Sequence, residues 1–167
     1  MAIGKVRFKP LWDAHPANLG INEPCLNKQG TAVFGNQCAI RMGVALKAVG
    51  VTVPNAKTTA QCGFGGHVQH VLLAEQLGYW ILGQKARFGT PEKKVGQKWD
   101  ATNGVTVDHY KGRQGIVFFK DFWARQGEDE EKNPTGDHIE VWDGTRQAHG
   151  DDGYFRRCKQ IWFWELP

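Results

Sequence analysis

The chain changes character near its midpoint, and this change limits the folds open to it. Residues 38–49 are mostly good helix formers with a broad apolar face, preceded by Asn36 as a suitable cap and followed by Gly50 as a suitable stop. The second half instead contains three β-rich runs, at 115–119, 139–142 and 160–164. Helices followed by strands predict an α+β domain in which N-terminal helices pack on a mainly antiparallel sheet.

Weaker patterns complete the expected organisation. A second helix is expected over 66–82, a short one near 11–17 and a helical patch around Trp99. The polar segment 124–137, which carries Glu128–Glu131, is expected to be a solvated loop. No repeat or linker divides the 167 residues, so 1–167 is predicted to form a single domain.

Charge and hydropathy narrow the range of partners. The net charge of +4 suits a polyanion or a bacterial wall, but the basic residues are scattered and form no aromatic-interleaved stripe, so nucleic acid is not expected. No apolar run approaches the roughly 20 residues of a membrane span, so no membrane insertion is expected. The stretch 1–7 lacks the features of a signal peptide. The protein therefore either works in the cytoplasm or leaves the cell by a route that reads no such signal.

Cys38 is the predicted nucleophile. It falls in the first turn of the helix expected over 38–49, where free backbone N–H groups and the helix dipole favour a thiolate. The same N–H groups are suited to stabilise an oxyanion. The alternative is a small buried apolar residue, which is the commonest role of a free cysteine.

His138 is the predicted general base. It opens the run 138–142, in which alternation turns Ile139 and Val141 to the core and His138 to the opposite face. An early cysteine at a helix tip, followed about a hundred residues later by a histidine on a strand, is the order used by papain-like thiol hydrolases. The third group that orients the imidazole stays open, with Asp151 preferred over three alternatives: Asp152, His149 and Glu140.

At these residues the sequence resembles the fourth family of type VI secretion amidase effectors. The stretch 36–42 is similar to that family's nucleophile motif, 136–144 to its base motif and 161–167 to its terminal strand. Some relatives place a catalytic aspartate near a close cysteine pair, whereas here Cys158 stands alone. Counting forward from the Asp143–Gly144 turn without a gap reaches His149, so Asp151 as the third residue assumes a small insertion.

The resemblance implies a papain-like cysteine amidase without a cofactor. Its substrate would be the peptidoglycan peptide stem, cut between the γ-carboxyl of D-glutamate and meso-diaminopimelate, with Cys38 as nucleophile and His138 as base. Made in the producer's cytoplasm, the protein would be exported by type VI secretion machinery into a target cell's periplasm. A cognate immunity protein would protect the producer by occluding the cleft.

Two residues are expected to contact substrate. Arg41 follows Cys38 by three residues and lies on nearly the same helix face. It either binds a substrate carboxylate or braces the domain through an internal ion pair. Trp142 shares the strand face of His138 and is the second expected contact.

Other functions remain as alternatives. His67 and His70 have helical spacing but no motif ligand beside them, and the four cysteines contain no CxxC pair, so no metal site is expected. Cys62 and His67 form a second, weaker cysteine–histidine pair, and disulfide pairing among Cys25, Cys62 and Cys158 is undecided. A non-enzymatic module that binds cell wall or protein would use three tryptophans at strand spacing, Trp142, Trp162 and Trp164. Acyl transfer or deamidation on the same fold also stays open.

Overall fold

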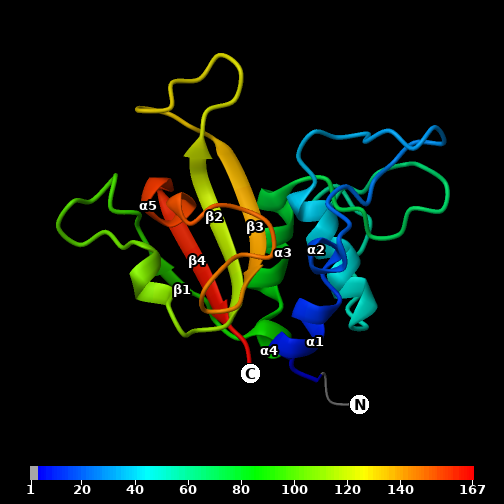
Figure 1. Cartoon of the computed structure of the whole chain (residues 1–167), viewed down its shortest axis with the longest axis horizontal. Helices are drawn as coiled ribbons and strands as arrows, with labels where there is room; N and C mark the ends of the chain where they lie inside the picture. Colours follow the sequence, from blue (N-terminus) through cyan, green and yellow to red (C-terminus); the bar gives the residue numbers. More distant parts are fainter. Residues whose placement is uncertain (1–3) are drawn as a thin grey trace.

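An antiparallel sheet of four strands forms the centre of the molecule, with the strand order β1-β4-β2-β3 (Figure 1). The computed structural model describes residues 4–167, so residues 1–3 of the stretch searched for a signal peptide lie outside it. The three predicted strands are confirmed and a short fourth is added: β1 (Glu92–Lys94), β2 (Gly115–Trp123), β3 (Gly136–Trp142) and β4 (Gln160–Glu165).

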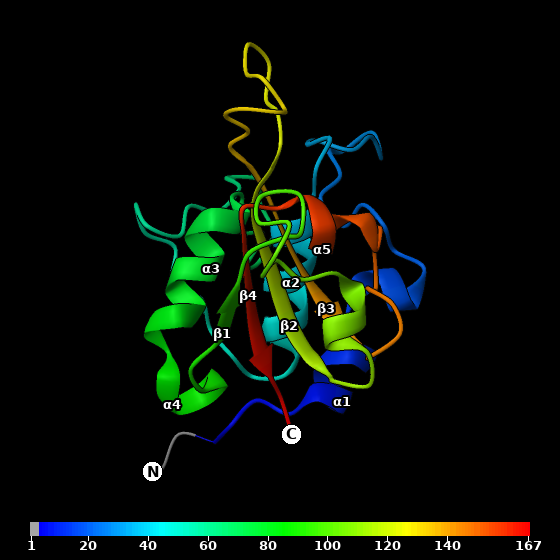
Figure 2. The same ribbon diagram turned by 90° about the vertical axis from the view of Figure 1, so that its left-hand side faces the viewer.

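Helices cover both faces of this sheet. The longest, α2 and α3, lie on one side, and α5 with the 3₁₀ turn η2 lies on the other (Figure 1). The elements are α1 (Phe8–Asp13), η1 (Pro16–Leu19), α2 (Cys38–Ala48), α3 (Ala74–Gly83), α4 (Lys85–Phe88), η2 (Val107–Tyr110) and α5 (Gly153–Arg157). Figure 2 shows the N-terminal segment passing close to the C-terminus, where the Phe8 N–H donates to the Pro167 carbonyl (2.8 Å).

Alternation along the strands divides the apolar side chains into two cores. On β2, Ile116 and Phe118 join the core under α2 and α3, whereas Val117 and Phe119 join the core under α5. Strand β4 alternates in the same way. Because both faces are covered, the central strands are apolar on both sides and not only on one.

Three expected helices differ from the structure for local reasons. The predicted helix 66–82 begins only at Ala74, because Gln69 adopts a left-handed backbone (φ 57°) that no right-handed helix accepts. The patch around Trp99 forms turns, in which the Asp100 carboxylate accepts backbone N–H groups two and three residues later. The helix near 11–17 is divided into α1 and η1, and Pro16 opens the second piece.

Within residues 4–167, none of the helices has the length and apolar character needed to cross a bilayer.

A close backbone contact attaches the loop between α2 and α3 to helix α2. The side-chain amide of Gln69 donates to the Gly43 and Val51 carbonyls (both 3.0 Å) and accepts from the Val53 N–H (3.1 Å). A β-carbon added at Gly43 would lie 2.1 Å from the Gln69 carbonyl oxygen, so only glycine fits there. The position of the loop beside α2 therefore depends on a residue that is unfavourable in a helix interior.

Replacing Gly43 with alanine is expected to lower the free energy of unfolding by about 1–3 kcal/mol, because backbone atoms must move apart. Helix propensity alone predicts the opposite sign, a gain of about 1 kcal/mol. The matched control is Gly83→Ala, since a β-carbon at this last residue of α3 meets no atom within 4 Å. Chemical denaturation of both variants measures the difference; equal stability of the two would contradict the contact.

Candidate active site

Cys38 is the first residue of α2, as the sequence predicts. Gln37 occupies the position before the helix, and the Asn36 side chain accepts the Cys38 backbone N–H (3.2 Å). At the other end, Gly50 has the left-handed conformation (φ 78°) that ends the helix. Asn36 and Gln37 thus set the start of α2 at Cys38, and Gly50 sets its end.

The expected thiolate is not favoured in the free protein. Burial raises the pKa of Cys38 to about 11, and this outweighs the backbone N–H groups of Ile139 and Ala39 and the charge of Arg41, which act in the opposite direction. Only 3% of the Cys38 surface is exposed. The helix terminus is present, but the loss of water around the sulfur has the larger effect.

His138 lies on β3, directly before the residue whose backbone contacts the Cys38 sulfur. Its ring packs among Phe119, Phe122 and Tyr154, the last with centroids 5.1 Å apart and edge to face. Burial lowers the pKa of His138 to about 4, so the ring is neutral at pH 7. The structure thereby places the predicted nucleophile against the backbone of the residue that follows the predicted base, with both side chains neutral at pH 7.

A backbone carbonyl orients the imidazole. Nε2 of His138 lies 3.2 Å from the carbonyl oxygen of His149, whereas the Asp151 carboxylate accepts the Gly153 N–H (2.6 Å) and is exposed to solvent. The geometry therefore favours the carbonyl of His149 over the side chain of Asp151 as the third group. The sequence shows candidate side chains such as Asp151, whereas a main-chain acceptor leaves no mark in it.

Arg41 braces the domain. Its guanidinium donates to the Asn22 carbonyl (2.8 Å) and to Nδ1 of His149 (3.1 Å), and it lies 3.8 Å from the Glu140 carboxylate. Glu140 is fully buried and also lies 2.8 Å from Nε2 of His15. With these partners, Arg41 is occupied internally, in agreement with the second of its two expected roles.

The tryptophans expected at a binding surface are core residues instead. Trp142 is fully buried, and its indole N–H donates to the Tyr110 carbonyl (2.9 Å). Trp162 and Trp164 are at most 2% exposed and lie in the core under α2 and α3. Trp142 thus has no surface to offer a substrate, and the binding-module alternative loses the residues on which it depended.

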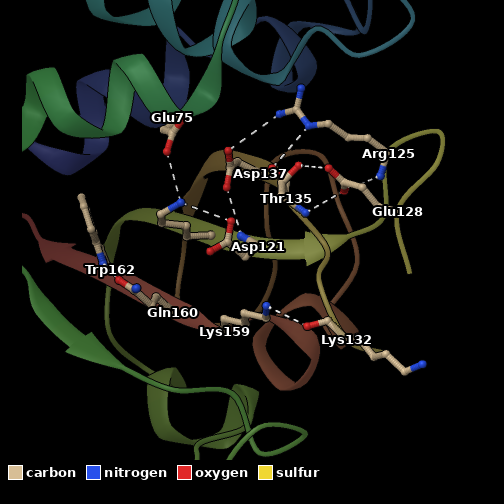
Figure 3. A network of polar contacts seen from close by, with 11 residues as sticks. Glu75, Asp121, Arg125, Glu128, Lys132, Thr135, Asp137, Lys159, Gln160 and Trp162 are labelled. Atoms are coloured by element: carbon tan, nitrogen blue, oxygen red, sulfur yellow. Dashed lines mark hydrogen bonds and ion pairs between the residues drawn. The ribbon is translucent and has the colours of Figure 1, made fainter. Parts of the chain in front are cut away.

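A cavity of about 540 Å³ opens beside the thiol. Cys38 and Asn36 form part of its wall, and Asn36 and Trp123 also border the neighbouring pocket that His138 lines. The polar part of the lining, most of which Figure 3 shows, is of mixed charge and consists of Glu75, Lys120, Asp121, Arg125, Thr135 and Asp137. The sequence did not single out these residues, because they come from helix α3, strands β2 and β3 and the loop between the two strands.

An irregularity in β2 forms part of this polar lining. The register with β3 shifts between Phe119 and Trp123, and Asp121 has a positive φ of 56°. Such bulges redirect side chains beside active sites. Here Lys120 reaches Glu75 (3.1 Å) and Asp121 (3.2 Å), and the Asp121 N–H donates to the Asp137 carboxylate (3.0 Å).

Gly136, at the start of β3, lies under the Trp123 ring. A β-carbon at Gly136 would lie 2.2 Å from the indole. Trp123 borders both pockets, so this close packing holds the ring in the wall that the two pockets share.

Asp137 is expected to destabilise the protein at neutral pH. Burial raises its pKa to about 6, so the folded state holds the proton more tightly than the unfolded state, and stability falls as the pH rises from about 4 to 6. Asp137→Asn keeps an acceptor for the Asp121 N–H and removes this loss. The variant should be more stable than the wild type by about 1–3 kcal/mol near pH 7.5, and nearly equal to it near pH 4. Thermal unfolding at the two pH values measures this, and a gain that is the same at both would refute it.

Comparison with solved structures identifies the same fold elsewhere. The type VI effector Tae4 from Enterobacter cloacae matches with a TM-score of 0.71 at 18% identity, covering 100% of both chains. The effector in the Tae4–Tai4 effector–immunity complex of that organism matches at 0.67 and 17%, covering 96% of this chain and 98% of that one. The corresponding complex from Salmonella Typhimurium matches at 0.65 and 16%, with the same coverage. The α+β fold class is confirmed.

A family model gives the narrower result. The model described as "Type VI secretion system (T6SS), amidase effector protein 4" matches residues 34–164, whereas no curated protein matches the chain. The match includes the nucleophile and base motifs on which the resemblance was based. It confirms the predicted family and the predicted class of enzyme, a peptidoglycan amidase. The chain belongs to the type VI secretion amidase effector 4 family.

Proposed function

We propose that this protein hydrolyses the amide between the γ-carboxyl of D-glutamate and meso-diaminopimelate in peptidoglycan stems. Cys38 attacks the amide carbon, and His138 takes the proton of the thiol. The observation that carries this proposal is the position of the Cys38 sulfur, at the start of α2 and against the backbone of Ile139. The residue directly before Ile139 is His138, whose imidazole is neutral at pH 7 and can accept a proton. Family membership supplies the reaction class.

The orienting carbonyl decides which ring nitrogen acts. A carbonyl oxygen only accepts, so Nε2 of His138 must carry the proton that bonds to His149. The lone pair then resides on Nδ1, which is free to accept the proton of the thiol. This assignment of the tautomer gives the His149 carbonyl the role of a triad's third member.

The reaction starts from the neutral pair. As the sulfur of Cys38 bonds to the amide carbon, its proton passes to Nδ1 of His138, and the imidazolium then protonates the departing amine. Breaking of the C–N bond leaves a thioester on Cys38. Water, deprotonated by His138, adds to the thioester and releases the carboxylate with return of the proton to sulfur. Because both groups are neutral at rest, charge develops only during the reaction, after the substrate has excluded water from the site.

The mixed lining of the cavity suits a stem peptide. The stem carries carboxylates and, on diaminopimelate, an amine. Lys120 and Arg125 offer cations for the former, and Asp121 and Asp137 offer acceptors for the latter. The overall charge of +4 also favours encounter with an anionic wall.

The partners follow from the same proposal. The solved structures of relatives include complexes of Tae4 with Tai4 immunity proteins. We propose that a cognate immunity protein occludes the cleft beside Cys38 in the producing cell. Export by type VI secretion machinery would then deliver the enzyme to the periplasm of the target cell.

Digestion of purified peptidoglycan tests the assignment. Mass spectrometry of the muropeptides should find stems cut at the D-glutamyl–diaminopimelate bond, and Cys38→Ala and His138→Ala should lower the rate by about four orders of magnitude. Asp151→Asn and its neighbour control Asp152→Asn should change the rate by less than about threefold, because a carbonyl orients the base. Undiminished activity of folded Cys38→Ala would end the proposal. A loss in Asp151→Asn alone that equals that of His138→Ala would return the third role to Asp151.

Alkylation tests the neutral pair. With pKa values of about 11 and about 4, the ion pair is a minor form in the free enzyme, so the thiolate fraction rises with pH. Labelling of Cys38 by iodoacetamide should accelerate about tenfold per pH unit between about pH 7 and pH 10. Peptide mapping resolves this cysteine from the other three. A rate that is independent of pH across this range would indicate a preformed thiolate–imidazolium pair instead.

A further inference from the structure

A second cluster of cysteine and histidine side chains lies outside the active site. Cys25 comes from the irregular segment before α2, and Cys62, His67 and His70 come from the loop before α3. One ligand atom from each of the four lies within 4.8 Å of every other. Both cysteines and His70 are buried, and His67 is half-buried. The proposed amidase reaction uses none of them.

The distances within the cluster are those of a tetrahedral metal centre. The two sulfurs are 3.7 Å apart, and Nδ1 of His67 lies 3.4 Å from the Cys25 sulfur and 3.2 Å from the Cys62 sulfur. A tetrahedron with Zn–S bonds of about 2.3 Å and Zn–N bonds of about 2.0–2.1 Å has sulfur–sulfur edges of about 3.8 Å and sulfur–nitrogen edges of about 3.5 Å. The two sulfurs and Nδ1 of His67 are therefore already spaced as three ligands of one zinc ion would be, and a ligand atom of His70 lies within 4.8 Å of the others.

His70 supplies an independent observation. Its Nδ1 is buried and has no hydrogen-bond partner among residues 4–167, although buried polar atoms normally have one. The ring is stacked on that of His67, with centroids 4.4 Å apart. A buried imidazole with an unused nitrogen beside two thiols is what a fourth metal ligand would look like before the metal binds.

We infer that Cys25, Cys62, His67 and His70 bind one zinc ion. Two thiols and two imidazoles match the ligand preference of zinc, which structural sites bind with four protein ligands and no open position. Binding displaces one proton from each thiol, and these two protons pass to solvent. Since all four positions are filled by the protein, the ion would stabilise structure and take no part in the reaction.

The backbone around the ligands is already ordered. The Gln37 side chain accepts the Cys25 N–H (2.7 Å) and donates to the Cys25 carbonyl (3.2 Å). The Cys62 N–H donates to the His70 carbonyl (3.0 Å). Because Gln37 directly precedes Cys38, zinc would join two irregular segments beside the residue that opens α2.

This inference replaces the expectation that the chain has no metal site. The expectation rested on the absence of a CxxC pair and of a motif ligand beside His67 and His70. The structure instead places these histidines in an irregular loop and brings Cys25 across from a distant part of the chain. Contacts of that kind are not visible in the spacing of a sequence.

Metal analysis of the full chain, purified without a polyhistidine tag, tests the site. Mass spectrometry of the metal content should find about one zinc per chain in the wild type and in two controls: Cys38→Ala, and His109→Ala at an exposed histidine outside the cluster. Cys62→Ser and His67→Ala should lose zinc affinity by more than the roughly 10–100-fold typical of changes around the ligands. Titration of metal-free wild type with cobalt should give the visible absorption of tetrahedral cobalt bound to thiolate. This measurement depends neither on the folding of a variant nor on amidase activity.

Two results would overturn the inference. One is a chain without zinc whose intact mass is lower by two hydrogens, with Cys25 and Cys62 joined in a disulfide, since their sulfurs are also close enough to pair after a small shift. The other is a reduced chain that gives no cobalt spectrum and keeps its thermal midpoint when zinc is added. A zinc-free chain with full amidase activity would leave the proposed reaction intact, whereas a zinc-loaded inactive chain would contradict the proposed reaction alone.

Discussion

The active site depends on the contacts that the buried Glu140 carboxylate makes with Arg41 and His15. Glu140 lies in β3, two residues after His138, and faces Arg41 of α2 and His15 of the N-terminal segment. Arg41 in turn contacts His149, whose carbonyl orients the base. Removing one partner from such a network leaves a buried charge, so the helix of the nucleophile and the strand of the base are held in one arrangement.

The parts of the structure that follow from local patterns were predictable. Helix α2 is predicted by its helix formers and its glycine stop, and strands β2, β3 and β4 are predicted by their β-rich runs. The positions of Cys38 and His138 follow from those elements alone. The strands were predicted too short because their ends, such as Asp137 at the start of β3, are polar and read as loop.

Features created by contacts between distant segments were not predictable. The role of the His149 carbonyl depends on the course of the main chain, and the burial of Trp142 depends on α5 covering the second face. The pKa of Cys38 is raised, whereas the helix terminus was expected to lower it. Burial outweighs the helix terminus, and no sequence pattern reports burial. The Cys25–Cys62 approach has the same origin.

The packing of Trp123 on Gly136 has a consequence for how this enzyme can diversify. The indole separates two pockets, one beside the sulfur of Cys38 and one beside the imidazole of His138. It packs on Gly136, which has no side chain. Any larger residue at position 136 would displace the indole and change the shape of both pockets together. Substitution of Gly136 can therefore alter the size of stem that the cleft accepts, without a change in any residue that contacts the substrate.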